Sequence, residues 1–425
     1  MSILREMTGK VWDLIVVGGG LTGVAAAVAA RREGLDVLIV EKAGFLGGAP
    51  GTLLINPFMP YATTVDGKRF ELSRGFFTEL RGLLKEAGGY VDGREDIHEE
   101  YVKLVLDRLV WKEGIQPLFH AVLCGVEQEG EHLTAVRVVT KAGILTFRGR
   151  YFIDASGDAA LAVMAGCPYH LGRPDGLCQP MTLCFRIGNV DIPTFQKHRQ
   201  EMQEKYKQFQ AEGKIKNPRE DVLIFHTLVD GVLHFNTTRV VKHDPTDPFD
   251  VTEAEMIARE QMFEMYDFLK NNCPGFEHSQ LLYSAGEIGA RESRMIDGEY
   301  LLTETDLRDC VQFEDAIAAG NYDIDIHNPE GSGTSHYYFP EGTWYTIPYR
   351  SLQPRGADNL LVAGRCISST HEAQASYRIM PIVATLGQAA GTAVALAARD
   401  DIGVKEIDVR KLQETLVQNG AFIGI

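Results

Sequence analysis

The sequence predicts an α/β fold in which a Rossmann-like nucleotide-binding domain is interrupted by an inserted α+β domain. Residues 12–42 follow the pattern strand, glycine turn, helix, strand. Residues 180–340 change character and mix short strands with charged helical stretches, and residues 345–425 return to an α/β pattern. A chain of 425 residues is also too long for one ordinary core, so two domains are expected.

Composition excludes several classes of protein. The formal net charge of −16 disfavours general nucleic-acid binding and docking on an anionic membrane. The seven cysteines include no CxxC pair and no Cys/His cluster at metal-ligand spacing, so no metal site is predicted. Residues 1–10 lack the apolar segment of a secretory signal, and the most apolar stretches are short or broken by Gly and charge. We therefore expect a soluble, cytoplasmic protein.

The first element pair carries the strongest motif. Residues 14–17 are a short apolar run, typical of a strand covered on both faces, and residues 24–32 form an alanine-rich helix. The turn between them fits GxGxxG, a pattern that allows a sharp turn, a close approach to a pyrophosphate and tight helix packing. The helix N-terminus then stabilises the phosphates. The predicted contacts are Gly18, Gly20, Leu21, Thr22 and Gly23.

A carboxylate follows the next strand, residues 37–40. Glu41 lies 18 residues after Gly23, where it can accept hydrogen bonds from both ribose hydroxyls of an adenosine. It would repel a 2′-phosphate, so NADP is disfavoured. Lys42 and a second glycine pair, Gly47 and Gly48, come just beyond it and suit a loop along an extended cofactor.

Three features favour FAD over NAD. The first feature is the glycine pair Gly47 and Gly48, just after Glu41. The second is a β-meander predicted over residues 116–152, which interrupts the simple Rossmann succession after a loop at 43–75 and two helices at 76–113. The third is the C-terminal strand and helix, which can close over the far end of the ligand. No second GxGxxG is present, so one dinucleotide site is expected.

The small-residue helix 381–399 is the predicted flavin end of the site. Pro381 suits the first helical position. An N-terminus aimed at the flavin would stabilise the negative charge of its reduced form. The alternative is a helix that only packs on the sheet.

Candidates for acid–base chemistry precede this helix. His371 could take a substrate proton, and Arg378 could bind an anion; the alternative for His371 is a structural role. Cys366 is either a reactive thiol or, more simply, a buried inert one.

The middle segment adds further candidates. Arg291 and Arg294 could clamp a carboxylate, although a salt-bridge network with nearby glutamates is an alternative. His336 could line the pocket, unless it belongs to a mobile loop.

On these segments the chain resembles the FAD-dependent oxidoreductases of the glutathione-reductase-like two-dinucleotide-binding superfamily. The resemblance rests on residues 13–42, 151–169, 291–306 and 347–393. It implies a ββα FAD/NAD(P)-binding Rossmann-like domain, residues 10–175 and 341–425, with an inserted α+β substrate or cap domain at 176–340. Further expected cofactor contacts are Val122, Ala155, Ser156, Gly157, Gly364, Arg365, Pro381 and Ile382.

One position departs from the wider superfamily. Many relatives carry an acidic residue where this chain has Arg365, which cannot accept a hydrogen bond. Arg365 could instead pair with the FAD pyrophosphate.

The resulting prediction is an FAD-dependent oxidoreductase that oxidises or reduces a small organic, possibly anionic, substrate by hydride transfer at the flavin. One alternative is a flavin electron-transfer subunit that works with a protein redox partner. A weaker alternative is a non-redox nucleotide-binding module. Substrate, direction and oligomeric state stay open.

Overall fold

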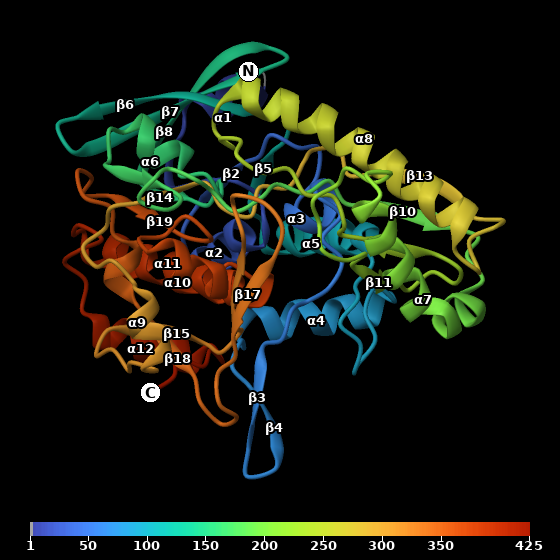
Figure 1. Cartoon of the computed structure of the whole chain (residues 1–425). Helices are drawn as coiled ribbons and strands as arrows, with labels where there is room; N and C mark the ends of the chain where they lie inside the picture. The colour runs from blue at the N-terminus through green and yellow to red at the C-terminus, as the bar shows by residue number, and fades with distance from the viewer. Residues whose placement is uncertain (1–2) are drawn as a thin grey trace.

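The computed structural model describes residues 3–425 and confirms an α/β fold. Its centre is a seven-stranded sheet in the order β5-β2-β1-β8-β7-β6, with β19 also paired to β8 (Figure 1). β5, β2, β1, β19 and the end of β8 run parallel, while β6, β7 and the start of β8 form the predicted antiparallel meander. The strands are β1 (Val11–Val17), β2 (Val37–Val40), β5 (Gln116–Leu118), β6 (Val122–Glu129), β7 (His132–Thr140), β8 (Gly143–Asp154) and β19 (Leu360–Val362).

The two faces of β1 explain why its sequence is continuously apolar. Leu14 points into a core shared with α2 (Leu21–Arg32) and α11 (Met380–Asp400), whereas Ile15 points into a second core beneath the meander. α2 and α11 come from opposite ends of the chain and pack side by side, blue against red in Figure 1. α11 is long and apolar enough to cross a membrane, but 94% of its most apolar window is buried inside the protein. Its apolarity is therefore that of a core helix.

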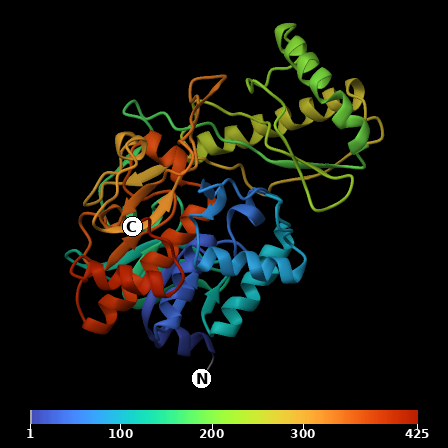
Figure 2. The same ribbon diagram turned by 90° about the horizontal axis from the view of Figure 1, so that it is seen from below.

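The middle of the chain builds a smaller antiparallel sheet in the order β11-β12-β10-β13. Its two long helices, α7 and α8, project from the main body in Figure 2. The inserted domain at 176–340 stays a prediction; the segment from Leu302 to Ile324 packs in the core that contains α2. The elements are β10 (Phe185–Gly188), α7 (Ile192–Ala211), β11 (Ile224–His226), β12 (Leu233–Phe235), α8 (Pro248–Asn272) and β13 (Gln280–Ser284).

The prediction of a loop over 43–75 is wrong in part. Residues 62–71 form a hairpin, β3 (Ala62–Val65) and β4 (Lys68–Glu71), after the short helix α3 (Ala49–Thr52). Asp66 and Gly67 turn the hairpin with φ of 52° and 70°. An Asp-Gly pair with both φ positive is a favoured two-residue hairpin turn, so the signal was present in the sequence.

Three two-stranded ladders and several helices complete the fold. The ladders are β9 (Tyr169–Leu171) with β14 (Arg294–Ile296), β15 (Ala316–Gly320) with β18 (Tyr345–Pro348), and β16 (Ile324–His327) with β17 (Thr334–Tyr337). The remaining helices are α1 (Ile3–Gly9), α4 (Phe76–Ala87), α5 (Glu99–Glu113), α6 (Ala160–Met164), α9 (Glu304–Arg308), the 3₁₀ turn η1 (Tyr349–Leu352), α10 (His371–Tyr377) and α12 (Val409–Gln418).

Candidate functional site

The glycine turn between β1 and α2 leaves no room for side chains. Gly18 has φ of +102°, and a Cβ there would lie 2.4 Å from the Ala155 carbonyl oxygen. A Cβ on Gly23 would lie 1.8 Å from the Gly18 oxygen. Gly20 caps α2 without any side-chain hydrogen bond, so the amides of the first turn remain available to an anion. These contacts fit a pyrophosphate.

Glu41 lies against this turn. Its Oε2 accepts a hydrogen bond from the Gly19 N–H at 2.6 Å, and its Oε1 accepts one from the Ala43 N–H at 2.7 Å. Each carboxylate oxygen can accept a second bond, so both remain available to ribose hydroxyls. The Gly47 N–H donates to the Gly19 oxygen at 2.8 Å, which places the second glycine pair beside the first.

The C-terminal segment packs on the helix that follows this turn, and its closure over the far end of the ligand stays a prediction. A Cβ on Gly387 would lie 2.1 Å from the Thr22 carbonyl oxygen, so α11 touches the backbone of α2. Gly364 also lies beside Thr22. α11 begins at Met380 with Pro381 in its first turn and no side-chain cap, and both Ile379 and Met380 line a cavity described below.

The other predicted cofactor contacts have partners within the chain. Arg365 donates from Nη2 to Asp158 Oδ1 at 2.7 Å and from Nε to the Gly157 oxygen at 2.8 Å. Its charge is therefore balanced by a carboxylate, and its contact with a pyrophosphate stays a prediction. Lys42 is paired with Glu287 at 2.6 Å. Ser156 donates to Asp154, Val122 is exposed at the start of β6, and Ile382 is buried in the first turn of α11.

A cavity of about 500 Å³ lies between the nucleotide-binding core and the smaller sheet. Its lining includes Ala49 of α3 and Met380 at the start of α11. The segments of β11 and β12 contribute alternate residues, from Leu223 to Phe225 and from His234 to Asn236. The cavity thus joins the predicted flavin end of the site to the middle segment.

Arg291 and Arg378, two of the candidate catalytic residues, both line this cavity. Arg291 donates to the Pro180 oxygen at 2.7 Å, to Thr182 Oγ1 at 2.5 Å and to Asn236 Oδ1 at 3.1 Å. Among the described residues it has no carboxylate partner, so the anticipated salt-bridge network with nearby glutamates is not formed.

The neighbouring arginines differ from Arg291 because each faces a carboxylate. Arg219, on the cavity wall, pairs with Asp221 at 2.9 Å. Arg378 lies 3.6 Å from Asp325. Sequence reasoning missed Arg219 because the run Arg-Glu-Asp at 219–221 resembles any solvated charged turn.

Arg294 and His371 lie elsewhere. Arg294 is on β14, donates to the Asp158 backbone oxygen at 2.9 Å and is not among the residues that line the cavity. His371 is buried at the start of α10, where its Nδ1 is 2.8 Å from both Glu292 oxygens and its Nε2 has no partner among the described residues. Their predicted catalytic roles stay predictions.

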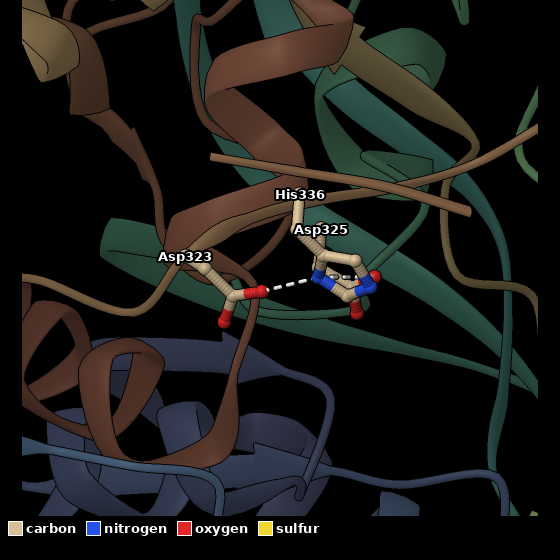
Figure 3. Close-up of side chains that lie close together, drawn as sticks. All are labelled: Asp323, Asp325 and His336. Atoms are coloured by element: carbon tan, nitrogen blue, oxygen red, sulfur yellow. Dashed lines mark hydrogen bonds and ion pairs between the residues drawn. The ribbon is translucent and has the colours of Figure 1, made fainter. Parts of the chain in front are cut away.

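His336 lines the cavity and lies beside two aspartates (Figure 3). Its Nδ1 is 2.5 Å from Asp323 Oδ2 and 3.8 Å from Asp325 Oδ1. Ligand atoms of the three residues lie within 4.8 Å of one another, a spacing that a metal could use. Asp325, however, also faces Arg378 and His327, so these carboxylates already balance cationic and imidazole groups. We assign the cluster to charge balance.

Cys366 is buried beside β19. Burial raises the pKa of its thiol to about 12, so the thiolate is scarce at neutral pH. This matches the interpretation of an inert thiol.

The comparisons with known proteins indicate the family of this chain. The family model described as FAD dependent oxidoreductase matches residues 13–416. A tryptophan 2-halogenase from Chondromyces crocatus is 28% identical over 162 residues, which make up 35% of this chain and 30% of the relative. A thioredoxin reductase from Ureaplasma parvum is 55% identical over 42 residues, 10% of this chain and 13% of the relative. The chain thus spans less than a third of the length of these curated relatives.

A solved structure supports the fold. The geranylgeranyl bacteriochlorophyll reductase-like protein from Thermoplasma acidophilum is similar over 97% of this chain and 84% of its own, with a TM-score of 0.50 and 13% identity. The glycine turn, Glu41 and the α11 terminus fit the cofactor that the family model names. The chain belongs to the FAD dependent oxidoreductase family.

Proposed function

We propose that this enzyme transfers hydride between its flavin and a small organic anion bound in the cavity. Bound FAD supplies the two-electron donor or acceptor. The chain's own residues bind the anion, orient it and keep its reacting carbon at the start of α11. The observation that carries the proposal is Arg291, a guanidinium that lines the cavity without a carboxylate partner.

An unpaired cation in such a place is costly unless a ligand balances it. Burial, together with the positive charges of Arg219 and Arg378, lowers the pKa of Arg291 to about 9. A bound carboxylate would reverse this penalty, which is a physical reason for the site to select anions.

The hydrogen bonds of Arg291 also favour a carboxylate. Three of its five N–H groups donate to Pro180, Thr182 and Asn236, which fixes the plane of the guanidinium. The Nε–H and one Nη2–H have no partner among the described groups. Nε and Nη2 form one edge of the planar fork, and this edge matches the two oxygens of a carboxylate.

The test is an anaerobic screen of the FAD-loaded enzyme, scored by flavin bleaching with reduced compounds or by re-oxidation of photoreduced flavin with oxidised ones. Organic acids should react, and their amides should not. Arg291→Ala should lower kcat/KM for the acids about 10- to 100-fold, the equivalent of one charged hydrogen-bond pair.

Arg259→Ala is the matched control, since Arg259 is an exposed arginine on α8 that does not line the cavity. An unchanged kcat/KM for the acids in Arg291→Ala, or a loss of the same size in the control, would contradict the proposal. Rapid flavin reduction by an acid alone would also distinguish the enzyme from an electron-transfer subunit that needs a protein partner.

A further inference from the structure

A second polar side chain in the cavity lining, His234, keeps one ring nitrogen without a partner among the described residues. His234 lies on β12, is 0% exposed and lines the cavity. Its Nδ1 faces the guanidinium of Arg186 on the adjacent strand β10. Its Nε2 is buried and bonds to no group in the described part of the chain. A buried nitrogen of this kind calls for a ligand.

The Arg186 contact determines which nitrogen of His234 carries the proton. A guanidinium can only donate, so Nδ1 must accept through its lone pair. The proton of the neutral ring is then on Nε2. Burial and the charge of Arg186 hold the pKa of His234 well below its usual value, so the ring stays neutral. His234 therefore offers an Nε2–H donor and no free lone pair.

His327 shows that this arrangement is specific. Its Nδ1 also faces an arginine, with Arg239 Nη2 at 3.0 Å. The Nε2 of His327, however, lies 3.5 Å from Asp325 Oδ2 and so has a carboxylate beside it. Of these two histidines, only His234 keeps an unpartnered donor.

The position of His234 relates this donor to Arg291. His234 and Asn236 are two residues apart, so they lie on the same face of the strand about 7 Å from each other. Asn236 is also the residue that holds Arg291, at 3.1 Å. His234 and Arg291 are therefore neighbours in the lining of the cavity, joined through Asn236.

We infer that His234 donates its Nε2–H to an oxygen of the substrate that lies near the carboxylate held by Arg291. This rests on the proposed function and narrows it to organic acids with a second oxygen group, an oxo acid and its hydroxy acid partner. A neutral imidazole donor polarises a carbonyl and stabilises negative charge that develops on its oxygen. No proton leaves His234, and it cannot act as a general base because its free nitrogen is already protonated. Solvent supplies the proton that the substrate oxygen gains on reduction and accepts the one it loses on oxidation.

The tautomer can be tested without activity. ¹⁵N spectra of the FAD-loaded enzyme, labelled at histidine, should show His234 neutral with the proton on Nε2 between pH 5.5 and 8. The resonance is assigned by its loss in His234→Gln. A protonated ring, or a proton on Nδ1, would overturn the inference.

Binding of matched probes tests the substrate contact. The wild-type enzyme should bind 2-oxobutyrate more tightly than butyrate, or 4-oxopentanoate more tightly than pentanoate, by about 3- to 10-fold, as one hydrogen bond provides. Binding is followed by perturbation of the flavin spectrum. His234→Phe should bring this ratio close to one and leave the affinity for the plain acid unchanged. His234→Gln keeps an N–H donor, so this variant should retain part of the preference for the oxo acid.

His226→Phe is the control, because His226 lies on the neighbouring strand β11, is exposed and does not line the cavity. If His234→Phe keeps the wild-type ratio of affinities for the oxo acid and the plain acid, the inference is overturned but the proposed function stands. The same holds if the wild type shows no preference for the oxo acid. If the wild type binds none of these acids, the proposed function itself fails and the inference fails with it. If His234→Phe does not fold, His234→Gln and the ¹⁵N spectra decide.

Discussion

The Gly19 N–H donates to the Glu41 carboxylate at 2.6 Å, and this bond joins the glycine turn to the end of the next strand. It holds the carboxylate at the place where the adenosine ribose of FAD is expected. The two halves of the GxGxxG…Glu signature are therefore one structural unit.

Removal of this carboxylate should weaken cofactor binding. Glu41→Ala loses two charge-assisted acceptors for the ribose hydroxyls, so FAD affinity should fall about 10- to 100-fold. The measurement is a titration of the apoenzyme with FAD, followed by fluorescence. Glu129→Ala, at an exposed turn of the meander, should not change the affinity. Equal affinity in Glu41→Ala would mean that the ribose contact is misassigned.

The contact between α2 and α11 predicts an unusual effect of alanine in a helix. Gly387→Ala would place a Cβ 2.1 Å from the Thr22 oxygen, so the helices must separate and the enzyme should lose about 1–3 kcal/mol of stability. Gly82→Ala, in the exposed face of α4, meets nothing within 4 Å and should gain about 0.5–1 kcal/mol. Urea denaturation of the two variants should shift in opposite directions; a gain in Gly387→Ala would contradict the packing.

The thiols should differ in reactivity. Cys366 is buried and its pKa is raised to about 12, whereas Cys124 is exposed. At pH 8, iodoacetamide should modify Cys124 and leave Cys366 unmodified, as read by peptide mass spectrometry. Cys366→Ala should still hold FAD and remain active. Release of flavin from that variant would show that the thiol has a role at the cofactor.

Acid should loosen the hairpin β16–β17 at the cavity. Burial favours the neutral form of Glu220, but hydrogen bonds, including one from Thr334, and the charges of Arg239 and Arg219 outweigh it and lower the pKa to about 2. Because the folded pKa lies below the unfolded value of about 4.3, the stabilisation is present at neutral pH and is lost as pH falls from about 4 towards 2.

Hydrogen exchange of residues 328–337 can measure this effect. The wild type should be better protected than Glu220→Gln at pH 6, and the difference should shrink as pH falls through that window. A difference that stays constant down to pH 2 would mean that Glu220 does not hold the hairpin through its charge.

Local patterns explain why the sequence could single out residues for the cofactor half of the site, whose contacts with FAD stay predictions. The glycine turn, Glu41 and Pro381 each lie at the end of one element, where local backbone requirements restrict the residue type. Arg291 and Arg378 were also identified, since both stand next to recognisable segments. The α/β fold followed from the alternation of buried strands and helices.

The substrate half depends on contacts between distant segments. His234 was visible only as part of a strand, and its importance comes from Arg186 on the neighbouring strand and from the cavity on its other side. The sequence suggested that Arg294 acts together with Arg291. Arg294 lies three residues further along the chain, however, and this places it on β14, beside Asp158. Neither outcome follows from spacing along the chain.

The packing of Gly387 on Thr22 also sets an order of events during synthesis. The helix after the glycine turn packs on α11, which leaves the ribosome only after the whole middle segment of the chain. A nascent chain that stops before Met380 would carry the whole glycine signature and yet lack the helix that supports it. Capture of FAD should therefore wait until α11 has been made, and a chain released before that point would remain colourless.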